Sequence, residues 1–595
     1  MLVGVVWPGW NIYHSSRKLL AVSTQLSAAA KTENLDQIKP ELAVSKQSMN
    51  DLNGSLNWLI WLRVIPFVGG YYSDAKHFAN AASDEMTAAE TVVEVLEPYK
   101  GELGLTGQAI TGQDRVAQMV KIMDKLLPSL DKISPSLQKA SNEVAGIDTG
   151  KYPGSLAGKS LRPRIEEVRN LIIAANSAVS DNRQLIELLP DALGESKPKT
   201  YLLLFQNDKE LRATGGFITA YAFLKLDKGH LSTTTSDDIY RLDEQLLKAC
   251  QTKICPLTPP APIVKYLPEV DGKPRTAWSL RDSNISPDLP TFAQEFERMY
   301  AMLGQGLPFD GIITIDTQVV EELIAATGPI EAGGTTYSAQ TDPRCNCPDV
   351  IYELEHYAEI ASQGEAGRKA ILGDLMQQLL AKVLGAGVTK LPEFADVAFN
   401  LANDKHIMFY MHNDQLEQAL SQLDWTGEIH RTNGDYLHIN DSNFAGGKSN
   451  LYVDETVTDD ISISSGVAKH TLTIKYENPQ PFNTWLNGIL RDYVRIYVPE
   501  GSQLVSSDGS DVIVTTQNDA ALGKTYFEAF ITVRPQNSRI LSFTYTAPVQ
   551  ITGGKYPLLV QRQPGAKDHH YIIKINGSKK AEFDLSADKQ LNLSF

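Results

Sequence analysis

Residues 199–224 read KTYLLLFQNDKELRATGGFITAYAFL, and the pattern of the chain changes at this stretch. YLLLF, at 201–205, is a short continuous apolar run, which is typical of a strand buried on both faces. GFITAYAFL, at 216–224, predicts a second strand. A polar segment with paired glycines separates the two runs, so we expect a tight connection between them.

The pattern downstream of these strands alternates between helix and strand. GIITID, at 311–316, predicts another buried strand. Alternation of this kind indicates a layered α/β domain, which we expect over residues 196–447. The predicted helices of this domain lie at 291–303, 317–326 and 367–385.

The segment before this domain, residues 15–195, is helical in pattern. Apolar side chains between 35 and 59 alternate spacings of three and four, as a coiled-coil seam requires, and the pattern recurs further on. WLIWLRVIPFVGGYY, at 58–72, contains Pro66 and a glycine pair, which predict a helical hairpin. Its aromatic residues are expected to cap the bundle, with contact to a bilayer or another protein as the alternative. We expect a helical bundle or stalk.

The segment after the α/β domain, residues 448–595, has a period of two. Leu472, Ile474 and Tyr476 alternate with polar residues, and similar runs are separated by Pro, Gly, Asn and Asp turns. This pattern predicts an all-β sandwich. A chain of 595 residues is too long for one core, which agrees with several domains.

The composition narrows the class of protein. The 42% hydrophobic and 21% charged content is that of a globular protein. A net charge of −16 argues against nucleic acid as a partner, because a phosphate backbone attracts a clustered basic face.

The first 14 residues form a separate apolar segment. MLVGVVWPGWNIY is shorter than a membrane-spanning helix, so it is either the outer half of a membrane anchor or a buried helix start. Trp7, Trp10 and Tyr13, followed by Arg17 and Lys18, favour the anchor, because aromatic rings settle at the membrane interface.

The four cysteines form two local pairs in segments predicted to be loops. Disulfides outside the cytoplasm are the favoured interpretation, and a four-thiolate zinc site and free thiols are the alternatives. The sequence leaves the pairing open. The cysteines are Cys250, Cys255, Cys345 and Cys347.

The polar segment between the first two strands is the first candidate site. Arg212 precedes Thr214, Gly215 and Gly216. Paired glycines let backbone amides converge, and a guanidinium binds phosphate oxygens bidentately. The segment therefore suits an anion, and a tight strand connection with a surface arginine is the alternative.

Two further clusters combine carboxylates with arginine. Asp237 and Asp238 are adjacent, and Arg281 is followed by Asp282. Carboxylates beside arginines suit a divalent cation, for which Mg²⁺ prefers oxygen ligands, together with a pyrophosphate. Surface salt bridges are the alternative.

Three segments together resemble the domain-of-unknown-function family 4012: YLLLFQNDKELRATGGF, DSNISPDLPTFAQ and FDGIITIDTQVVEELIAATGPIEA. That family is in turn distantly similar to the LytR-CpsA-Psr transferases, which move glycopolymers from a polyprenyl-pyrophosphate carrier to a wall acceptor. The resemblance implies an extracytoplasmic cell-envelope protein at the cell membrane with a LytR-CpsA-Psr-like α/β domain.

The resemblance also implies roles for individual residues. Arg212 matches the first arginine of the transferase motif, although the aspartate that follows it there is missing here. Asp238 falls at a catalytic aspartate, and Arg368 resembles an arginine of their Arg-rich helix. The implied pyrophosphate ligands are Arg212, Thr214, Gly215, Gly216, Arg281 and Arg368, with Asp237 and Asp282 as ligands of Mg²⁺.

Three functions remain open at this point. The first is a phosphotransferase that attaches a glycopolymer to a wall acceptor. The second is a non-catalytic module that binds a lipid carrier or glycan. The third is a structural surface protein on a helical stalk. Arginines that face one cleft with Asp238 or Asp282, beside an apolar slot, would favour the first two.

Overall fold

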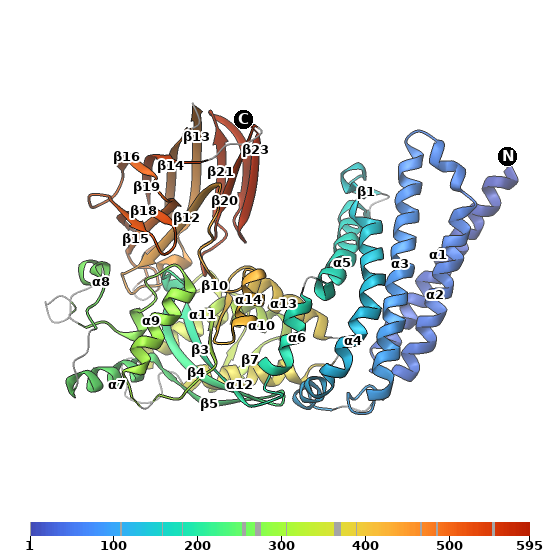
Figure 1. Cartoon of the computed structure of the whole chain (residues 1–595), viewed down its shortest axis with the longest axis horizontal. Coiled ribbons are helices and arrows are strands. Elements are labelled where there is room, and N and C mark those ends of the chain that lie inside the picture. Colours follow the sequence, from blue (N-terminus) through green and yellow to red (C-terminus); the bar gives the residue numbers. More distant parts are fainter. Residues whose placement is uncertain are drawn as a thin grey trace. The chain divides into compact units, whose positions relative to one another are not determined.

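The chain contains several domains in two compact units (Figure 1). One unit comprises Met1–Lys199, Leu226–Leu231 and Val383–Pro392, and the other contains the remaining residues. The computed structural model describes residues 2–594 except 108–109, 157–158, 181, 253–256, 268–274, 276, 305, 362–369, 388–389, 465–466, 484–485 and 550–553.

The first unit is a bundle in which consecutive helices pack against each other. Apolar residues at heptad spacing form its seams: Leu35 and Leu42 pack with Val93, and Met49 and Leu56 pack with Ala79. The prediction of a helical N-terminal region is confirmed. The helices are α1 (Leu2–Ala30), α2 (Leu35–Asn57), α3 (Val68–Leu96), α4 (Gly112–Ala145), α5 (Arg162–Ser180) and α6 (Arg183–Ala192).

The hairpin between α2 and α3 reverses the chain through the short 3₁₀ helix η1 (Ile60–Val64). Gly69 lies in the first turn of α3, and a β-carbon there would stand 2.3 Å from the carbonyl oxygen of Arg63. The expectation that the aromatic residues cap the bundle is wrong for most of them, because Trp58 is 66% and Phe67 93% exposed. Tyr72 does pack in the bundle, since it is buried and its hydroxyl donates to Leu56 O, and the partly exposed Tyr71 lies edge-on against Tyr152.

The N-terminal apolar segment forms the first turns of α1. Trp7, Trp10 and Tyr13 are among the residues whose side chains are not described. Within the described part of the chain, we find no helix with the length and apolar character needed to cross a membrane.

The central α/β region is built on a five-stranded sheet in the order β11-β6-β3-β4-β5. β3 is parallel to β6, and β11 is antiparallel to β6. The strands are β3 (Lys199–Asn207), β4 (Phe217–Asp227), β5 (His230–Asp238), β6 (Gly311–Ile315) and β11 (Ile407–Met411).

Helices cover both faces of this sheet, which explains the continuous apolar run of β3. Leu202 and Leu204 pack against the side that carries α7 and α9, while Leu203 and Phe205 pack against the side that carries α10 and α13. The helices of this region are α7 (Ile239–Thr252), α8 (Ala261–Tyr266), α9 (Leu289–Ala301), α10 (Thr317–Thr327), α11 (Asp349–Ala361), α12 (Ala370–Gly385), α13 (Leu391–Asn403) and α14 (Asp414–Gln422).

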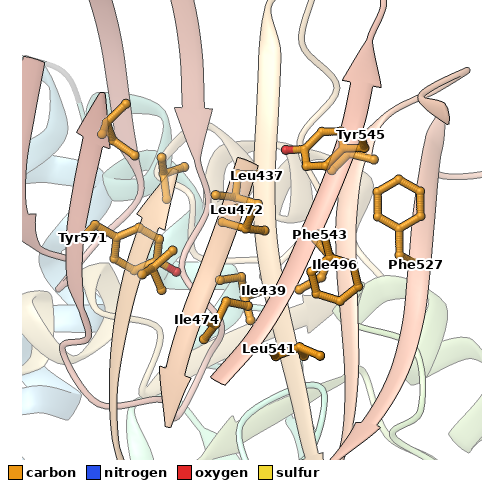
Figure 2. Packing of buried hydrophobic residues seen from close by; sticks show 14 of the residues in the cluster. Leu437, Ile439, Leu472, Ile474, Ile496, Phe527, Leu541, Phe543, Tyr545 and Tyr571 are labelled. Atoms are coloured by element: carbon orange, nitrogen blue, oxygen red, sulfur yellow. The ribbon is translucent and has the colours of Figure 1, made fainter. Parts of the chain in front are cut away.

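The C-terminal region consists of two six-stranded sheets, in the orders β17-β18-β15-β12-β20-β23 and β16-β19-β14-β13-β21-β22. Their facing side chains form one apolar core (Figure 2), in which Ile439 and Phe527 of the first sheet meet Leu472 and Phe543 of the second. The strands are β12 (Asp435–Asn443), β13 (Asp454–Ser464), β14 (Val467–Asn478), β15 (Leu490–Pro499), β16 (Gln503–Asp508), β17 (Thr515–Asp519), β18 (Lys524–Val533), β19 (Asn537–Ala547), β20 (Lys555–Val560), β21 (His570–Ile575), β22 (Ser578–Asp584) and β23 (Lys589–Ser594).

Strand β12 joins the sandwich to the α/β region. It lies before residue 448, where the alternating pattern of the sequence begins. β12 itself does not alternate, because all of its residues are buried. Leu437 and Ile439 face the sandwich core, whereas Asn440 donates to the carbonyl oxygen of Ala213 in the loop between β3 and β4. The polar side chains of β12 are therefore buried against protein groups: Asn440 binds the α/β region, while Asp435 and Asp441 accept from tyrosines of the sandwich.

The loop before α11 contains a disulfide between Cys345 and Cys347, whose Cα atoms are 5.1 Å apart. Cys250 lies on α7 and is also disulfide-bonded. Cys255 is outside the described residues.

Candidate functional site

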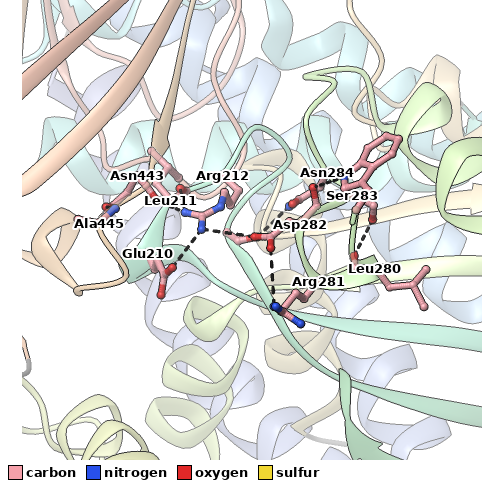
Figure 3. Close-up of polar contacts among 12 residues, drawn as sticks. Glu210, Leu211, Arg212, Leu280, Arg281, Asp282, Ser283, Asn284, Asn443 and Ala445 are labelled. Atoms are coloured by element: carbon pink, nitrogen blue, oxygen red, sulfur yellow. Dashed lines mark hydrogen bonds and ion pairs between the residues drawn. The ribbon is translucent and has the colours of Figure 1, made fainter. Parts of the chain in front are cut away.

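Arg212, Asp282 and Arg281 form a continuous ionic chain (Figure 3). Asp282 lies between the two guanidinium groups, 3.8 Å from Arg212 Nη2 and 3.7 Å from Arg281 Nε. Arg281 Nη1 also donates to Asp243 Oδ2 on α7 at 2.6 Å. The structure thus brings together two of the arginines and one of the carboxylates singled out in the sequence.

Arg212 occupies the buried end of this chain, with only 2% of the residue exposed. Its guanidinium donates to the carbonyl oxygen of Asn443 on β12 and to Glu210 Oε1 at 3.2 Å. It also lies over the rings of Phe217 and Phe444, 5.4 and 5.1 Å from their centroids. In this position Arg212 ties the β3–β4 loop to the sandwich.

Thr214 and Gly216 belong to a buried hydrogen-bond network. The Thr214 hydroxyl and the Gly216 N–H both donate to Gln206 Oε1, at 3.2 and 3.1 Å. Asn284 donates to the Gly216 carbonyl oxygen at 2.9 Å. Gly215 adopts a φ of 127°, which favours glycine. These polar groups bind one another, so they are not available to bind an anion.

Arg281 lies at the edge of a cavity of about 370 Å³, which we call the α7 cavity. The side chain of Arg281 is 17% exposed, and its guanidinium lies 4.5 Å from the centroid of the Tyr240 ring. The wall is largely apolar, and Leu247 at its rim is 54% exposed. The lining consists of Tyr240, Asp243, Glu244, Leu246, Leu247, Cys250, Leu257, Ala277, Trp278, Ser279 and Arg281.

Two carboxylates line this cavity, Glu244 and Asp243, and Asp243 is the one that pairs with Arg281. Its Oδ1 accepts the N–H of Leu280 at 2.6 Å, and its Oδ2 accepts from Arg281. Burial raises the pKa of Asp243 to about 6, although Arg281 acts in the opposite direction. A carboxyl group with this pKa can exchange a proton near neutral pH. Sequence patterns gave no sign of Asp243, because it falls within an ordinary amphipathic helix.

Asp237 and Asp238 lie where β5 ends and α7 begins. Asp237 Oδ1 accepts the N–H of Asp238 at 2.7 Å, and Asp238 Oδ1 accepts the N–H of Tyr240 at 3.0 Å. Asp238 therefore caps the helix that carries Asp243. Arg368, the remaining pyrophosphate ligand expected from the sequence, lies outside the described residues.

Two groups of side chains in the described residues have the spacing of metal ligands, and neither contains Asp237 or Asp282. Each already holds a cationic side chain. Arg344 contacts Asp342, Asp349 and Glu353 in one, and Lys405 contacts Asp424 and Asp588 in the other. The second group also contains His430.

A second cavity, of about 570 Å³, lies at the carboxyl ends of β3 and β6, and we call it the β3–β6 cavity. Ligands often bind at this edge of α/β sheets. Lys209 pairs with Asp208 at 2.7 Å and with Glu321 at 3.0 Å. Next to them, His406 Nδ1 lies 2.6 Å from Asp316 Oδ2.

The charged side chains around the β3–β6 cavity stabilise one another. Burial opposes the charged form of His406, but the adjacent Asp316 carboxylate raises the pKa of His406 overall. The sequence signal that could have identified this site is the position of Asp208 and Asp316, each directly after a buried strand. Its other walls come from α13 and from residues 562–568 of the sandwich.

The comparison with protein families matches residues 196–342, from just before β3 to the end of β9 (Thr341–Asp342), to the family described as "Protein of unknown function (DUF4012)". This match supports the family resemblance of the α/β region. A search of curated proteins gave no match. All lining residues of the α7 cavity lie within the matched segment, whereas the β3–β6 cavity draws much of its wall from outside it.

Proposed function

We propose that this protein is a binding module of the cell envelope, in which the α7 cavity holds the phosphate-bearing end of a lipid-linked glycan. The observation that carries the proposal is the guanidinium of Arg281 at the edge of a cavity whose described lining is largely apolar. A guanidinium binds phosphate oxygens bidentately, and Leu247 and Trp278 offer apolar surface. A polyprenyl phosphate or pyrophosphate combines both properties in one ligand.

The ionic chain behind Arg281 supports this proposal. Asp282 and Asp243 hold the guanidinium from two sides, so its position is fixed before a ligand arrives. Preorganised groups bind with a smaller entropy loss. Because Asp282 already contacts two guanidinium groups, we assign charge neutralisation to Arg281 rather than to Mg²⁺. Ligand binding should therefore persist when EDTA is present.

The location that we propose is the extracytoplasmic face of the cell membrane. The Cys345–Cys347 disulfide supports it, because disulfides persist in oxidising compartments. A glycan carrier and its wall acceptor would both be accessible there.

The experiment is a calorimetric titration with geranylgeranyl pyrophosphate, alongside geranylgeraniol and inorganic pyrophosphate. Arg281→Lys keeps the charge but loses the planar fork, so we expect the affinity to fall about tenfold, which corresponds to one charge-assisted hydrogen bond. Arg298→Lys, on exposed α9 surface, is the matched control. Unchanged affinity in folded Arg281→Lys and Arg281→Gln variants would refute the proposal.

A second function, phosphotransfer by a LytR-CpsA-Psr-like mechanism, is favoured by the pKa of Asp243. As a general base, Asp243 would take the proton of the acceptor hydroxyl while Arg281 stabilises charge on the leaving phosphate. Protein incubated with a lipid-pyrophosphate glycan and an acceptor should then release polyprenyl phosphate. The rate should rise with pH through about 6 and be lost in Asp243→Asn, whereas ligand binding should weaken only partly, because Asp282 still holds Arg281. Binding without release would leave the module non-catalytic.

A further inference from the structure

The hairpin between α2 and α3 exposes a concentration of large apolar side chains. We call residues 58–71 the α2–α3 tip. Monomeric proteins rarely expose large contiguous apolar patches unless the patch binds something. The most exposed side chains of the tip, with their exposed fractions, are Phe67 (93%), Val64 (84%), Trp58 (66%), Ile60 (62%), Tyr71 (43%), Val68 (42%) and Trp61 (42%).

The charge of the tip is as distinctive as its apolar surface. Arg63 is the single charged residue between 58 and 72, and the segment contains no carboxylate. At its border, Lys151 lies 5.9 Å from the centroid of the Tyr71 ring and pairs with Asp74 at 2.6 Å, so Arg63 is the cationic group of the tip itself. Apolar residues with Trp and Tyr among them, next to cationic groups, are the composition of segments that settle at a lipid interface.

The backbone of the tip indicates that folding alone does not explain its sequence. Phe67 has a φ of 63°, in the left-handed region where a bulky side chain is unfavourable and glycine is preferred. A phenylalanine in this conformation with almost its whole side chain in solvent contributes little to the core. Residues held in such conformations cluster at functional sites.

The bundle places a second apolar segment at the same end. Leu19 of α1 packs with Met49 and Leu56 of α2, whereas Leu26 packs with Leu35 and Leu42, so the two helices are antiparallel. The first turns of α1, which read LVGVVWPGW, therefore lie at the end of α2 that leads into the tip (Figure 1).

From these observations we infer that the α2–α3 tip inserts into the interfacial region of an anionic lipid bilayer. Val64 and Phe67 enter the headgroup and upper acyl region, typically about 5–10 Å deep. Arg63 stays with the lipid phosphates, because its long side chain lets the charge remain in the polar layer. This contact is independent of any ligand in the α7 cavity.

The test measures membrane insertion with a label placed in the tip itself. The signal therefore does not depend on whether α1 also binds the membrane. A Phe67→Cys variant of the full chain carries an environment-sensitive nitrobenzoxadiazole label; the described native cysteines are all disulfide-bonded. Ile513→Cys is the matched control, since Ile513 is 89% exposed on the sandwich. With 3:1 phosphatidylcholine–phosphatidylglycerol vesicles, we expect a blue shift and an intensity gain at position 67 and no change at 513.

Vesicle binding supplies the second measurement. A Val64→Ser/Phe67→Ser variant should bind at least about tenfold more weakly, from the apolar surface lost, and Ile513→Ser should bind like the wild type. Phe67→Gly should also bind more weakly while its thermal midpoint stays equal or rises, because the strain is relieved. The inference is overturned if the label at 67 stays unchanged on vesicles that carry the protein, or if it responds to protein concentration without lipid, which would indicate a protein partner.

Discussion

Arg212 lies between two carboxylates and a main-chain carbonyl oxygen in the interior of the second unit. Glu210 and Asp282 face its guanidinium, and Lys448 binds the other oxygen of Glu210 at 2.7 Å. Buried charges of this kind are stable only when each has a partner of opposite charge, so removing one of them is costly. The arginine therefore acts on stability through partners from both the α/β region and the sandwich.

We expect Arg212→Ala to lower the free energy of unfolding by about 3–5 kcal/mol, because Asp282 and Glu210 would lose a buried partner. Urea denaturation followed by circular dichroism measures this change. Arg539→Ala is the control: that arginine is 39% exposed and pairs with Asp511, so its loss should cost at most about 1 kcal/mol. Equal effects of the two substitutions would contradict the role given to Arg212.

Gly216 shows a different constraint at the same loop. A β-carbon at this position would stand 2.2 Å from the carbonyl carbon of Asn207. Gly216→Ala should destabilise the protein by about 1–3 kcal/mol, as overpacking does. Gly146→Ala is the comparison, because a β-carbon there would have no neighbour within 4 Å and the φ of Gly146 is −84°. A neutral Gly216→Ala would mean that the loop can move away from β3.

At the scale of elements, four charged groups join the segments around β11 and α14 to the end of the sandwich. Lys405 Nζ lies 2.8 Å from Asp588 and 3.2 Å from Asp424, and His430 Nε2 lies 2.7 Å from Asp424. Hydrogen bonds to Asp424 and Asp588 raise the pKa of His430 to about 9. The protonated imidazole is thus part of the interface at neutral pH.

This pKa predicts how stability depends on pH. The pKa of His430 is higher in the folded state than the ordinary value of 6.5, so its contribution is complete below about pH 6.5 and is lost as pH rises through about 9. Buried His470, whose pKa is also raised to about 9, acts over the same range. The measurement is therefore the difference in the free energy of unfolding between the wild type and His430→Gln as a function of pH. This difference should be constant below pH 6 and shrink towards pH 10. A difference that does not vary with pH would contradict a charged His430.

At the scale of the whole molecule, the α/β region and the sandwich depend on each other unequally. The sandwich has its own core between two sheets, and its contacts with the α/β region combine hydrogen bonds from Asn440 of β12 and from Gln563 with the rings of Tyr493 and Phe530, which pack on α8. In the α/β region, by contrast, the buried charged residues Glu210, Arg212 and Lys405 each contact a partner in the sandwich.

We therefore expect residues 435–595 to fold when expressed alone and residues 200–434 to fail to do so. In the isolated sandwich, water would solvate the uncovered amides of β12, whereas the α/β fragment would keep charges without partners. Amide dispersion in NMR spectra and a cooperative thermal transition distinguish the two fragments. A folded 200–434 fragment would show that these charges find other partners.

Much of the architecture followed from periodicity. The heptads of 35–96, the continuous apolar run of β3 and the alternation of β14 each record which faces of an element are buried, and burial is a local property of the sequence. The sequence pattern did not predict β12, since both of its faces are buried and both carry polar residues, so apolar and polar positions do not alternate. The exposure of the α2–α3 tip was not predicted either, because apolar residues predict burial in the protein core and the pattern does not distinguish a core from a membrane or a partner protein.

The sequence by itself determined a helical N-terminal region, an α/β region and a strand-rich C-terminal region, because the spacing of apolar residues specifies each kind of element. Only the tertiary structure decided what the charged residues of 199–224 contact. The sequence suggests that Arg212 is an anion ligand in a tight strand connection, yet its guanidinium is buried and donates to the carbonyl oxygen of Asn443, 231 positions away. Charge–charge contacts depend on distances in space, and those distances arise only when the sheets and helices pack.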